Sequence, residues 1–278
     1  MTTSVATGPL PANGIVKARR SPRKSGKILL LQIVSFVVVL LVWTLVAMSG
    51  VLSEATLPTI PAVLNAWFGF LGTAKYWTAV GLTLQGAALG LALAALVGIP
   101  LGLLTGSIAV AEKSSRLLVD VARSFPVIAL LPVFLIMMGS KMETKVTIIF
   151  IACVFPVLLQ AQYGAQSVTP TIKDTVNSYR IPRVLRFFKV ELPAATPSIM
   201  TGLRLGATTA VLVGIGVEVL TTIPGIGHEV VDAQVGMNSA ASFAYIFTAG
   251  ALGFGINKLM ELLEKVLLRW RPPAGLED

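Results

Sequence analysis

The sequence predicts an all-α, polytopic membrane protein with six transmembrane helices, and its composition and apolar segments carry that prediction. Hydrophobic residues make up 55% of the 278 residues, charged residues only 13%, and the mean hydropathy is +0.82. A soluble domain of this length cannot bury so much apolar surface. Several apolar segments also reach the roughly 20 residues that a helix needs to cross a hydrocarbon core about 30 Å thick.

The apolar segments define the predicted domains. The first, residues 28–50, is too long for a signal peptide and no small-residue cleavage site follows it, so we expect a retained span. Residues 1–27 have little to bury and predict a disordered basic tail in the cytoplasm, and residues 273–278 predict a C-terminal tail. The transmembrane domain covers residues 28–272, with spans near 28–50, 79–106, 116–138, 146–168, 199–220 and 241–265.

Lys and Arg residues predict the orientation of the spans. The net charge of +9 comes from short basic runs between apolar segments, a pattern typical of membrane orientation and not of a nucleic-acid surface. Between the spans, one side of the predicted membrane holds Lys75, Lys141 and Lys145, and the other holds most of the basic residues. Because cytoplasmic loops carry the excess, both termini and the loop 169–198 are expected in the cytoplasm. The short apolar stretch 57–71 is expected in the outer interface.

Two predicted spans carry small residues at intervals of four, on one helical face. Such a face lets a second helix approach closely, although a smooth pore wall is an alternative interpretation. The second span has Gly86, Gly90, Gly98, Gly102 and Gly106, and the fifth has Ser198, Gly202, Gly206, Ala210 and Gly214, followed by Glu218. A carboxylate at the end of such a face is a candidate for function. The candidates for a translocation pathway or gate are Ser124, Gly206, Gly214 and Glu218.

The sequence predicts no catalytic or metal site. It has one histidine and one cysteine, Cys153, and it contains no phosphate-binding loop and no Cys and His cluster with metal-ligand spacing. The stretch HEVVD, residues 228–232, has an acid where a zinc-protease helix has its second histidine. A membrane-embedded enzyme is therefore not expected.

The loop between the fourth and fifth spans predicts two short helices outside the membrane. Pro170 suits the start of a helix over 171–179, and Pro182 the start of a second over 182–190. Since the residue before a proline disfavours helix, Leu192 is expected to be extended, and Pro197 is expected to begin the fifth span.

This loop resembles the cytoplasmic signature of binding-protein-dependent ABC importer permeases, in which an acid, two small residues, three variable residues and a glycine precede a hydrophobic helix and a Leu-Pro pair. Here Asp174 matches the acid and Phe187 the aromatic helix position, and the downstream matches are Leu192, Pro193, Pro197 and Gly202. Further matches are residues 117–139, 197–206 and 224–230, Glu218 and the closing LLRWRP. The resemblance covers residues 55–272 and is strongest to the nitrate, sulfonate and taurine branch.

Three positions depart from the family pattern. Thr175 and Val176 stand where the family has two alanines, and Arg180 stands at the usual turn glycine. Glycine there supplies backbone freedom, often a positive φ, that arginine adopts only at a cost. Three interpretations stay open: a turn built differently through Ile181 and Pro182, a contact of Arg180 with an ATPase, or a solvated charge in a slightly altered turn.

The resemblance implies a type I ABC importer permease fold in a bacterial inner membrane, and a non-catalytic subunit without a cofactor of its own. Its partners would be a dimer of ATPase subunits that bind ATP, a second permease expected to be an identical copy, and an extracytoplasmic solute-binding protein. The ATPase-coupling residues would be Asp174, Tyr179, Arg180, Arg183, Phe187, Leu192 and Pro193.

The substrate would be a small solute, expected to be an anion of the nitrate, sulfonate or taurine kind or an aromatic acid, moved by ATP-driven alternating access. A stand-alone secondary transporter or channel is the alternative. It would be favoured by inverted repeats and ionisable residues at the membrane midplane, and the sequence displays neither.

Overall fold

The computed structural model describes residues 24–269, which are helical with connecting turns and contain no strand. The chain divides into two compact units, Met1–Val51 and Leu52–Asp278, and each is described by itself. The predicted C-terminal tail and most of the predicted basic tail lie outside the described residues, at 270–278 and 1–23. In the first unit, α1 (Lys24–Met48) begins inside the predicted tail and is apolar on every side, as a single membrane span is.

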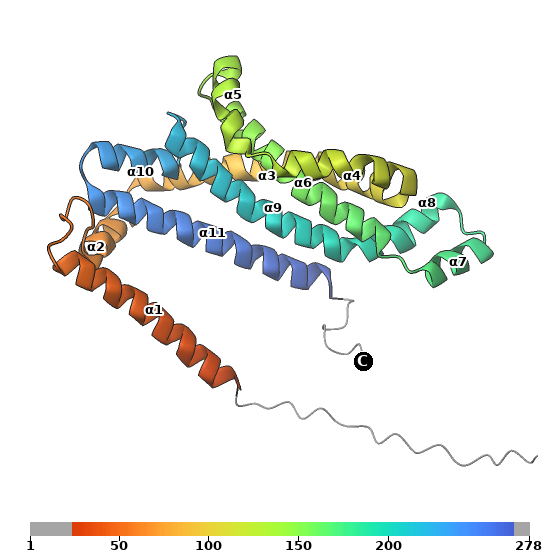
Figure 1. Cartoon of the computed structure of the whole chain (residues 1–278), viewed down its shortest axis with the longest axis horizontal. Helices are drawn as coiled ribbons and strands as arrows, with labels where there is room; N and C mark the ends of the chain where they lie inside the picture. The colour runs from red at the N-terminus through yellow and green to blue at the C-terminus, as the bar shows by residue number, and fades with distance from the viewer. Residues whose placement is uncertain (1–23, 270–278) are drawn as a thin grey trace, which may run out of the picture. The chain divides into compact units, whose positions relative to one another are not determined.

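The second unit is built around three long helices. Helices α3 and α9 both pack along α6, and α11 packs along α9 (Figure 1). Helices α7 and α8 lie at one end of this unit and α2 and α10 at the other, which we name the α7 end and the α10 end (Figure 1). Its elements are α2 (Ile60–Leu71), α3 (Ala74–Ser107), α4 (Ala109–Ser124), η1 (Val127–Leu130), α5 (Leu131–Met138), α6 (Met142–Gln166), α7 (Pro170–Ser178), α8 (Arg183–Arg186), η2 (Phe187–Glu191), α9 (Leu192–Leu220), α10 (Ile226–Val235) and α11 (Ser239–Leu267).

Five helical stretches within residues 24–269 are long and apolar enough to cross a membrane. They are Ile28–Met48, Ala74–Ser107, Met142–Gln166, Arg183–Leu220 and Ser239–Leu267. The predicted span at 116–138 is instead a pair of helical stretches, Val110–Ser124 and Val127–Met138, bent by 77°. The break has a local cause, because Phe125 is extended (φ −77°, ψ 129°) directly before Pro126. Counting this bent pair as one broken span gives the six that the sequence predicts.

The glycine face of α3 is a site of close helix contact, as predicted. A Cβ atom on Gly98 would lie 3.0 Å from the Val154 carbonyl oxygen, and one on Gly106 would lie 2.9 Å from Ala165 Cβ. Added Cβ atoms at Gly86, Gly90 and Gly102 would likewise overlap atoms of α6. The two backbones therefore lie very close together over five helical turns. In lipid the hydrophobic effect does not drive helices together, and close packing of this kind stabilises their association instead.

Replacing Gly102 by alanine tests this contact, and Gly81 on the same helix offers a matched control. The added Cβ would overlap the Leu158 carbonyl oxygen and lie 2.7 Å from Ala161 Cβ, whereas Gly81 faces open space. We expect Gly102→Ala to lower the free energy of unfolding by about 1–3 kcal/mol, and Gly81→Ala to leave it unchanged or raise it slightly. Thermal unfolding of the detergent-solubilised protein measures both, and equal midpoints for the two variants would contradict the contact.

Candidate functional site

The predicted coupling segment, residues 170–197, forms the α7 end of the second unit. The two predicted short helices are present as α7, which starts at Pro170, and as α8 with η2, which follows Pro182. The second of them leads into α9 without a break, so Arg183–Leu220 is one helical run of 38 residues. The segment is thus continuous with a membrane-spanning helix.

The expectation that Leu192 is extended and that Pro197 begins the fifth span is wrong. Leu192 is helical (φ −65°, ψ −46°), Pro193 lies in the first turn of α9, and Pro197 lies inside it. The π turn η2 explains this, because the Leu192 N–H donates to the carbonyl of Phe187, five residues back. A widened turn gives room to the ring of Pro193, which in a regular helix crowds the carbonyl four residues earlier.

The turn between α7 and α8 has the backbone that a glycine would give it. Arg180 has a φ of 50°, in the left-handed region. Its N–H donates to the Asn177 carbonyl at 3.0 Å, and the Ile181 N–H donates to the Val176 carbonyl at 3.2 Å. These bonds form a Schellman motif followed by Pro182. The interpretation of a differently built turn is therefore wrong, and Arg180 carries a left-handed conformation that costs about 1–2 kcal/mol.

Arg186 joins the two short helices, and the sequence reasoning missed it. Its Nε donates to Glu191 Oε1 at 2.7 Å, and its Nη1 donates to Asn177 Oδ1 at 3.1 Å. The first contact is part of an ion pair. Arg186 and Glu191 are five residues apart, a spacing that an α-helix does not bring together and a π turn does. The contacts of Arg186 with Asn177 and Glu191 are therefore visible in the folded structure and not in the sequence pattern.

Two of the predicted coupling residues pack the segment against α3, α6 and α9. Phe187 and Leu192 are half-buried and pack against a cluster that includes Leu103 of α3, Ala161 of α6 and Ile199 of α9. Other contacts tie α6 to the start of α9. The Ser167 hydroxyl donates to the Ala194 carbonyl at 3.1 Å, and a Cβ on Gly164 would lie 2.8 Å from the Ala195 carbonyl oxygen.

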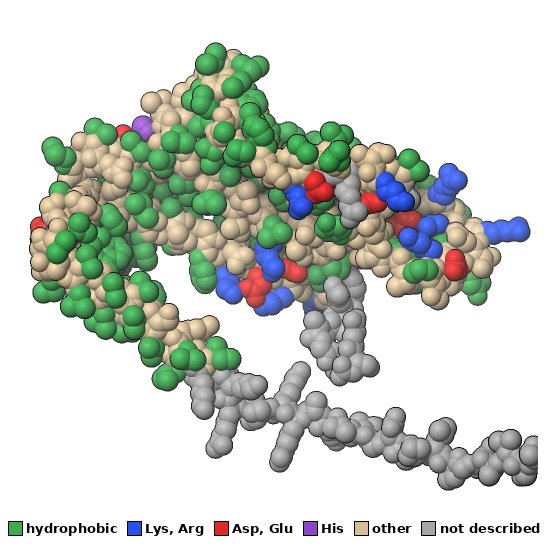
Figure 2. Space-filling model, viewed as in Figure 1, with side chains coloured by type: hydrophobic (Ala, Val, Ile, Leu, Met, Phe, Trp, Pro, Cys, Tyr) green, Lys and Arg blue, Asp and Glu red, His purple; other side chains and the backbone are tan. Residues whose placement is uncertain are grey.

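The remaining predicted coupling residues, Asp174, Tyr179, Arg180, Arg183 and Pro193, are exposed. Large apolar side chains are exposed at this end: the exposed fraction is 78% for Tyr179, 70% for Val184 and 59% for Phe188. Figure 2 shows Lys and Arg side chains gathered at this end. An exposed surface that mixes large apolar and basic side chains is typical of a protein interface.

The four predicted pathway residues lie in different surroundings. Ser124 is exposed and its hydroxyl donates to the Asp120 carbonyl at 2.8 Å. Gly206 faces Leu91 and residues of α6, and Gly214 faces Ile149 of α6. These contacts support helix packing over a pore wall within this chain, and a pathway role for the four residues stays a prediction.

Glu218 lies in a buried polar cluster near the α10 end. Its Oε1 accepts from Lys145 Nζ at 2.9 Å, its Oε2 accepts from the Gly227 N–H at 3.0 Å, and the Thr83 hydroxyl lies 2.9 Å from both oxygens. Lys145 Nζ also donates to the Leu82 carbonyl at 3.0 Å. Both charged side chains are 0% exposed.

The sequence reasoning placed Lys145 in an outer loop and missed its pairing with Glu218. Lys145 lies in the first turn of α6, which begins at Met142. The available signal was that an acid and a base flank two apolar spans at the same predicted side of the membrane. A charge at such a position is expected to have a partner.

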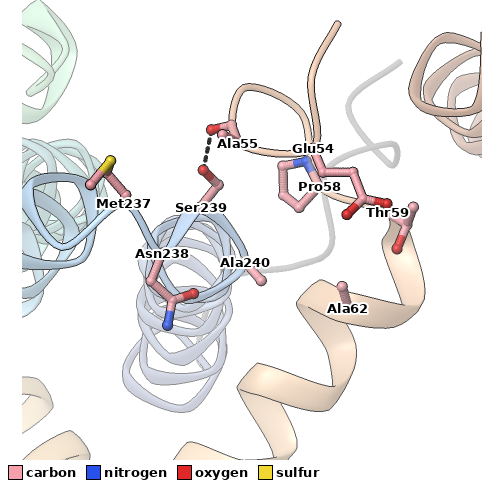
Figure 3. A pocket seen from close by; sticks show the side chains of 9 residues that line it. All are labelled: Glu54, Ala55, Pro58, Thr59, Ala62, Met237, Asn238, Ser239 and Ala240. Atoms are coloured by element: carbon pink, nitrogen blue, oxygen red, sulfur yellow. Dashed lines mark hydrogen bonds between the residues drawn. The ribbon is translucent and has the colours of Figure 1, made fainter. Parts of the chain in front are cut away.

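A pocket of about 480 Å³ lies near the α10 end, between the starts of α2 and α11 (Figure 3). Asn238 accepts from the Ala241 N–H at 3.0 Å, and the Ser239 hydroxyl donates to the Ala55 carbonyl. The 9 residues that line the pocket carry one charged side chain, Glu54, and no Lys or Arg. This lining does not fit an anionic solute.

Comparison with known proteins gives one consistent family. Residues 98–270 match the family model described as binding-protein-dependent transport system inner membrane component. The chain is 26% identical over 281 residues to the putative aliphatic sulfonates transport permease protein SsuC of Bacillus subtilis, with 98% of each chain covered. It is 28% identical over 242 residues to the nitrate import permease protein NrtB of Synechocystis, covering 84% of this chain and 88% of the relative.

The fold also matches solved structures. A chain of the MetNI methionine ABC transporter superposes with a TM-score of 0.62 at 15% sequence identity, covering 69% of this chain and 95% of that chain. At this identity the likeness shows a shared fold, which is the permease fold of ABC importers.

The strained turn at Arg180 leads to a stability prediction. Glycine adopts a φ of 50° without steric cost, so we expect Arg180→Gly to raise the free energy of unfolding by up to about 1 kcal/mol. Arg180→Ala removes the same charge but keeps the Cβ, and it is expected to leave the strain in place. Thermal unfolding of the two variants separates the effects. A midpoint for the glycine variant no higher than that of the alanine variant would contradict the strain.

Proposed function

Because the chain belongs to the binding-protein-dependent transport system inner membrane components, we propose that it is the permease subunit of an ATP-driven importer. It is a multi-pass protein of the inner membrane. The observation that carries the proposal is the α7 end, where an exposed apolar and basic surface is continuous with a membrane-spanning helix.

The surface of α7, α8 and η2 is the proposed docking site of a separate ATPase. Tyr179, Val184 and Phe188 would enter an apolar groove of that subunit, and Arg180 and Arg183 would meet acidic residues around it. The ATPase would bind and hydrolyse ATP, and this chain would bind no nucleotide. Two copies of the ATPase would serve two copies of this permease.

The continuous helical run supports a direct transfer of motion. A displacement of η2 would pass into α9 along one helix, because no extended residue separates them. Arg186 holds α7 to the same body through Asn177 and Glu191. Closure of the ATPase dimer would thereby move α9 against α3 and α6 and alternate the inward-open and outward-open states.

The proposed solute is a small anion. The two relatives are named for the solutes aliphatic sulfonates and nitrate, and both of these solutes are anions. Lys145 does not attract such a solute, because Glu218 neutralises it. Selection by a separate solute-binding protein that delivers the anion fits this arrangement.

Docking is tested with two matched substitutions at opposite ends of the second unit. Val184 and Val235 are both strongly exposed, at 70% and 79%. We expect Val184→Asp to abolish co-purification with the ATPase and ATP-dependent uptake of sulfonate or nitrate into vesicles. Val235→Asp, at the end of α10, is expected to retain the ATPase.

Both variants must insert into the membrane and unfold at the wild-type temperature for this comparison to hold. Equal retention of the ATPase by both variants would contradict docking at the α7 end. Solute flux in vesicles that contain this chain alone would favour the alternative of a stand-alone transporter or channel.

A further inference from the structure

We propose that Glu218 is a positioning residue that fixes the start of α10 to the far end of α9, so that α10 moves with α9 during transport, and that Lys145 balances the buried charge of Glu218. This inference rests on the proposed importer function. It concerns the end of α9 that lies opposite the proposed ATPase surface (Figure 1).

The buried carboxylate lies where α9 ends and α10 begins. Glu218 lies two residues before the end of α9, and the chain returns over residues 221–225 to start α10 at Ile226. The Gly227 N–H donates to Glu218 Oε2 at 3.0 Å, and the Ile226 N–H donates to the Thr83 hydroxyl oxygen at 2.9 Å. The first N–H groups of a helix lack partners within it, and a negative charge is favourable there. Glu218 therefore caps α10 from another helix.

The glycines of the returning loop allow this close approach. A Cβ on Gly225 would overlap the carboxyl group of Glu218, and a Cβ on Gly227 would lie 2.8 Å from Glu218 Cβ. The two glycines of the stretch PGIG, residues 224–227, therefore allow the loop backbone to contact the Glu218 carboxylate directly. This gives the motif a physical role at the α10 end.

Lys145 completes the arrangement by connecting it to α3 and α6. Its Nζ lies 2.9 Å from Glu218 Oε1 and donates to the Leu82 carbonyl at 3.0 Å, so four segments meet at one ion pair. A Cβ on Gly86 would overlap the Lys145 side chain, which leaves the lysine little freedom to move. Buried ion pairs often add little stability compared with apolar residues of the same size. The bond that Glu218 accepts from the Gly227 N–H is therefore the better explanation for the buried carboxylate, and Lys145 is its counter-charge.

Two double variants separate positioning from folding, because both remove the two buried charges. Lys145→Met with Glu218→Gln keeps a side-chain oxygen that can accept from the Gly227 N–H. Lys145→Met with Glu218→Leu removes that acceptor. Each is assembled with its ATPase and solute-binding protein in vesicles, and solute uptake and ATP hydrolysis are measured together. A peptide spanning residues 221–235 reports hydrogen exchange of the α10 amides.

We expect the Leu double variant to hydrolyse ATP but to carry at least tenfold less solute per ATP than wild type, with faster exchange in the 221–235 peptide. The Gln double variant should stay within threefold of wild type in both measurements. Wild-type transport per ATP in the Leu variant would overturn the proposal. So would an equal loss in the two variants at equal thermal stability. Absence of ATP-dependent uptake in the wild-type complex would instead refute the importer function.

Discussion

The close contact between α3 and α6 is the constraint on which the other features depend. Because glycines of α3 lie against backbone and side-chain atoms of α6, the two helices stay in register from Gly86 to Gly106. At one end this register brings Thr83 and Lys145 together on Glu218. At the other it builds the apolar cluster that receives Phe187 and Leu192. Both ends of α9 are thus positioned by one pair of helices.

The sequence was sufficient for features that depend on local pattern. Apolar length predicted the spans, and the interval of four predicted the packed faces of α3 and α9. The family's turn glycine marked Arg180 as a departure but left the backbone of the turn open, and the structure gives it a φ of 50°. Prolines were less predictable. Pro100 and Pro156 stay inside helices, whereas Pro126 follows an extended residue and breaks a predicted span. The outcome depends on room in the preceding turn and on neighbouring helices, which the residues alone do not display.

Pairings across the fold were beyond the sequence for a different reason. Lys145 and Glu218 are 73 residues apart, and their contact depends on the register of α6 against α9. Arg186 and Glu191 are near in sequence, but a π turn and not an α-helix brings them together. The coupling role of the residues in this segment is an expectation from resemblance. Their division into exposed side chains and the half-buried Phe187 and Leu192 required the folded α7 end.

The pairing of cations near the α10 end has a consequence for how a solute is chosen. Lys145 is neutralised by Glu218, and Lys75 Nζ lies 2.6 Å from Glu229 Oε2. The pocket between α2 and α11 carries a carboxylate and no basic side chain. An anion that reached this end would therefore meet two lysines already engaged with carboxylates, Lys75 and Lys145, and one exposed lysine, Lys141. The proposed recognition of the anion by a partner fits these two neutralised lysines, whose charges are used within the chain to connect helices.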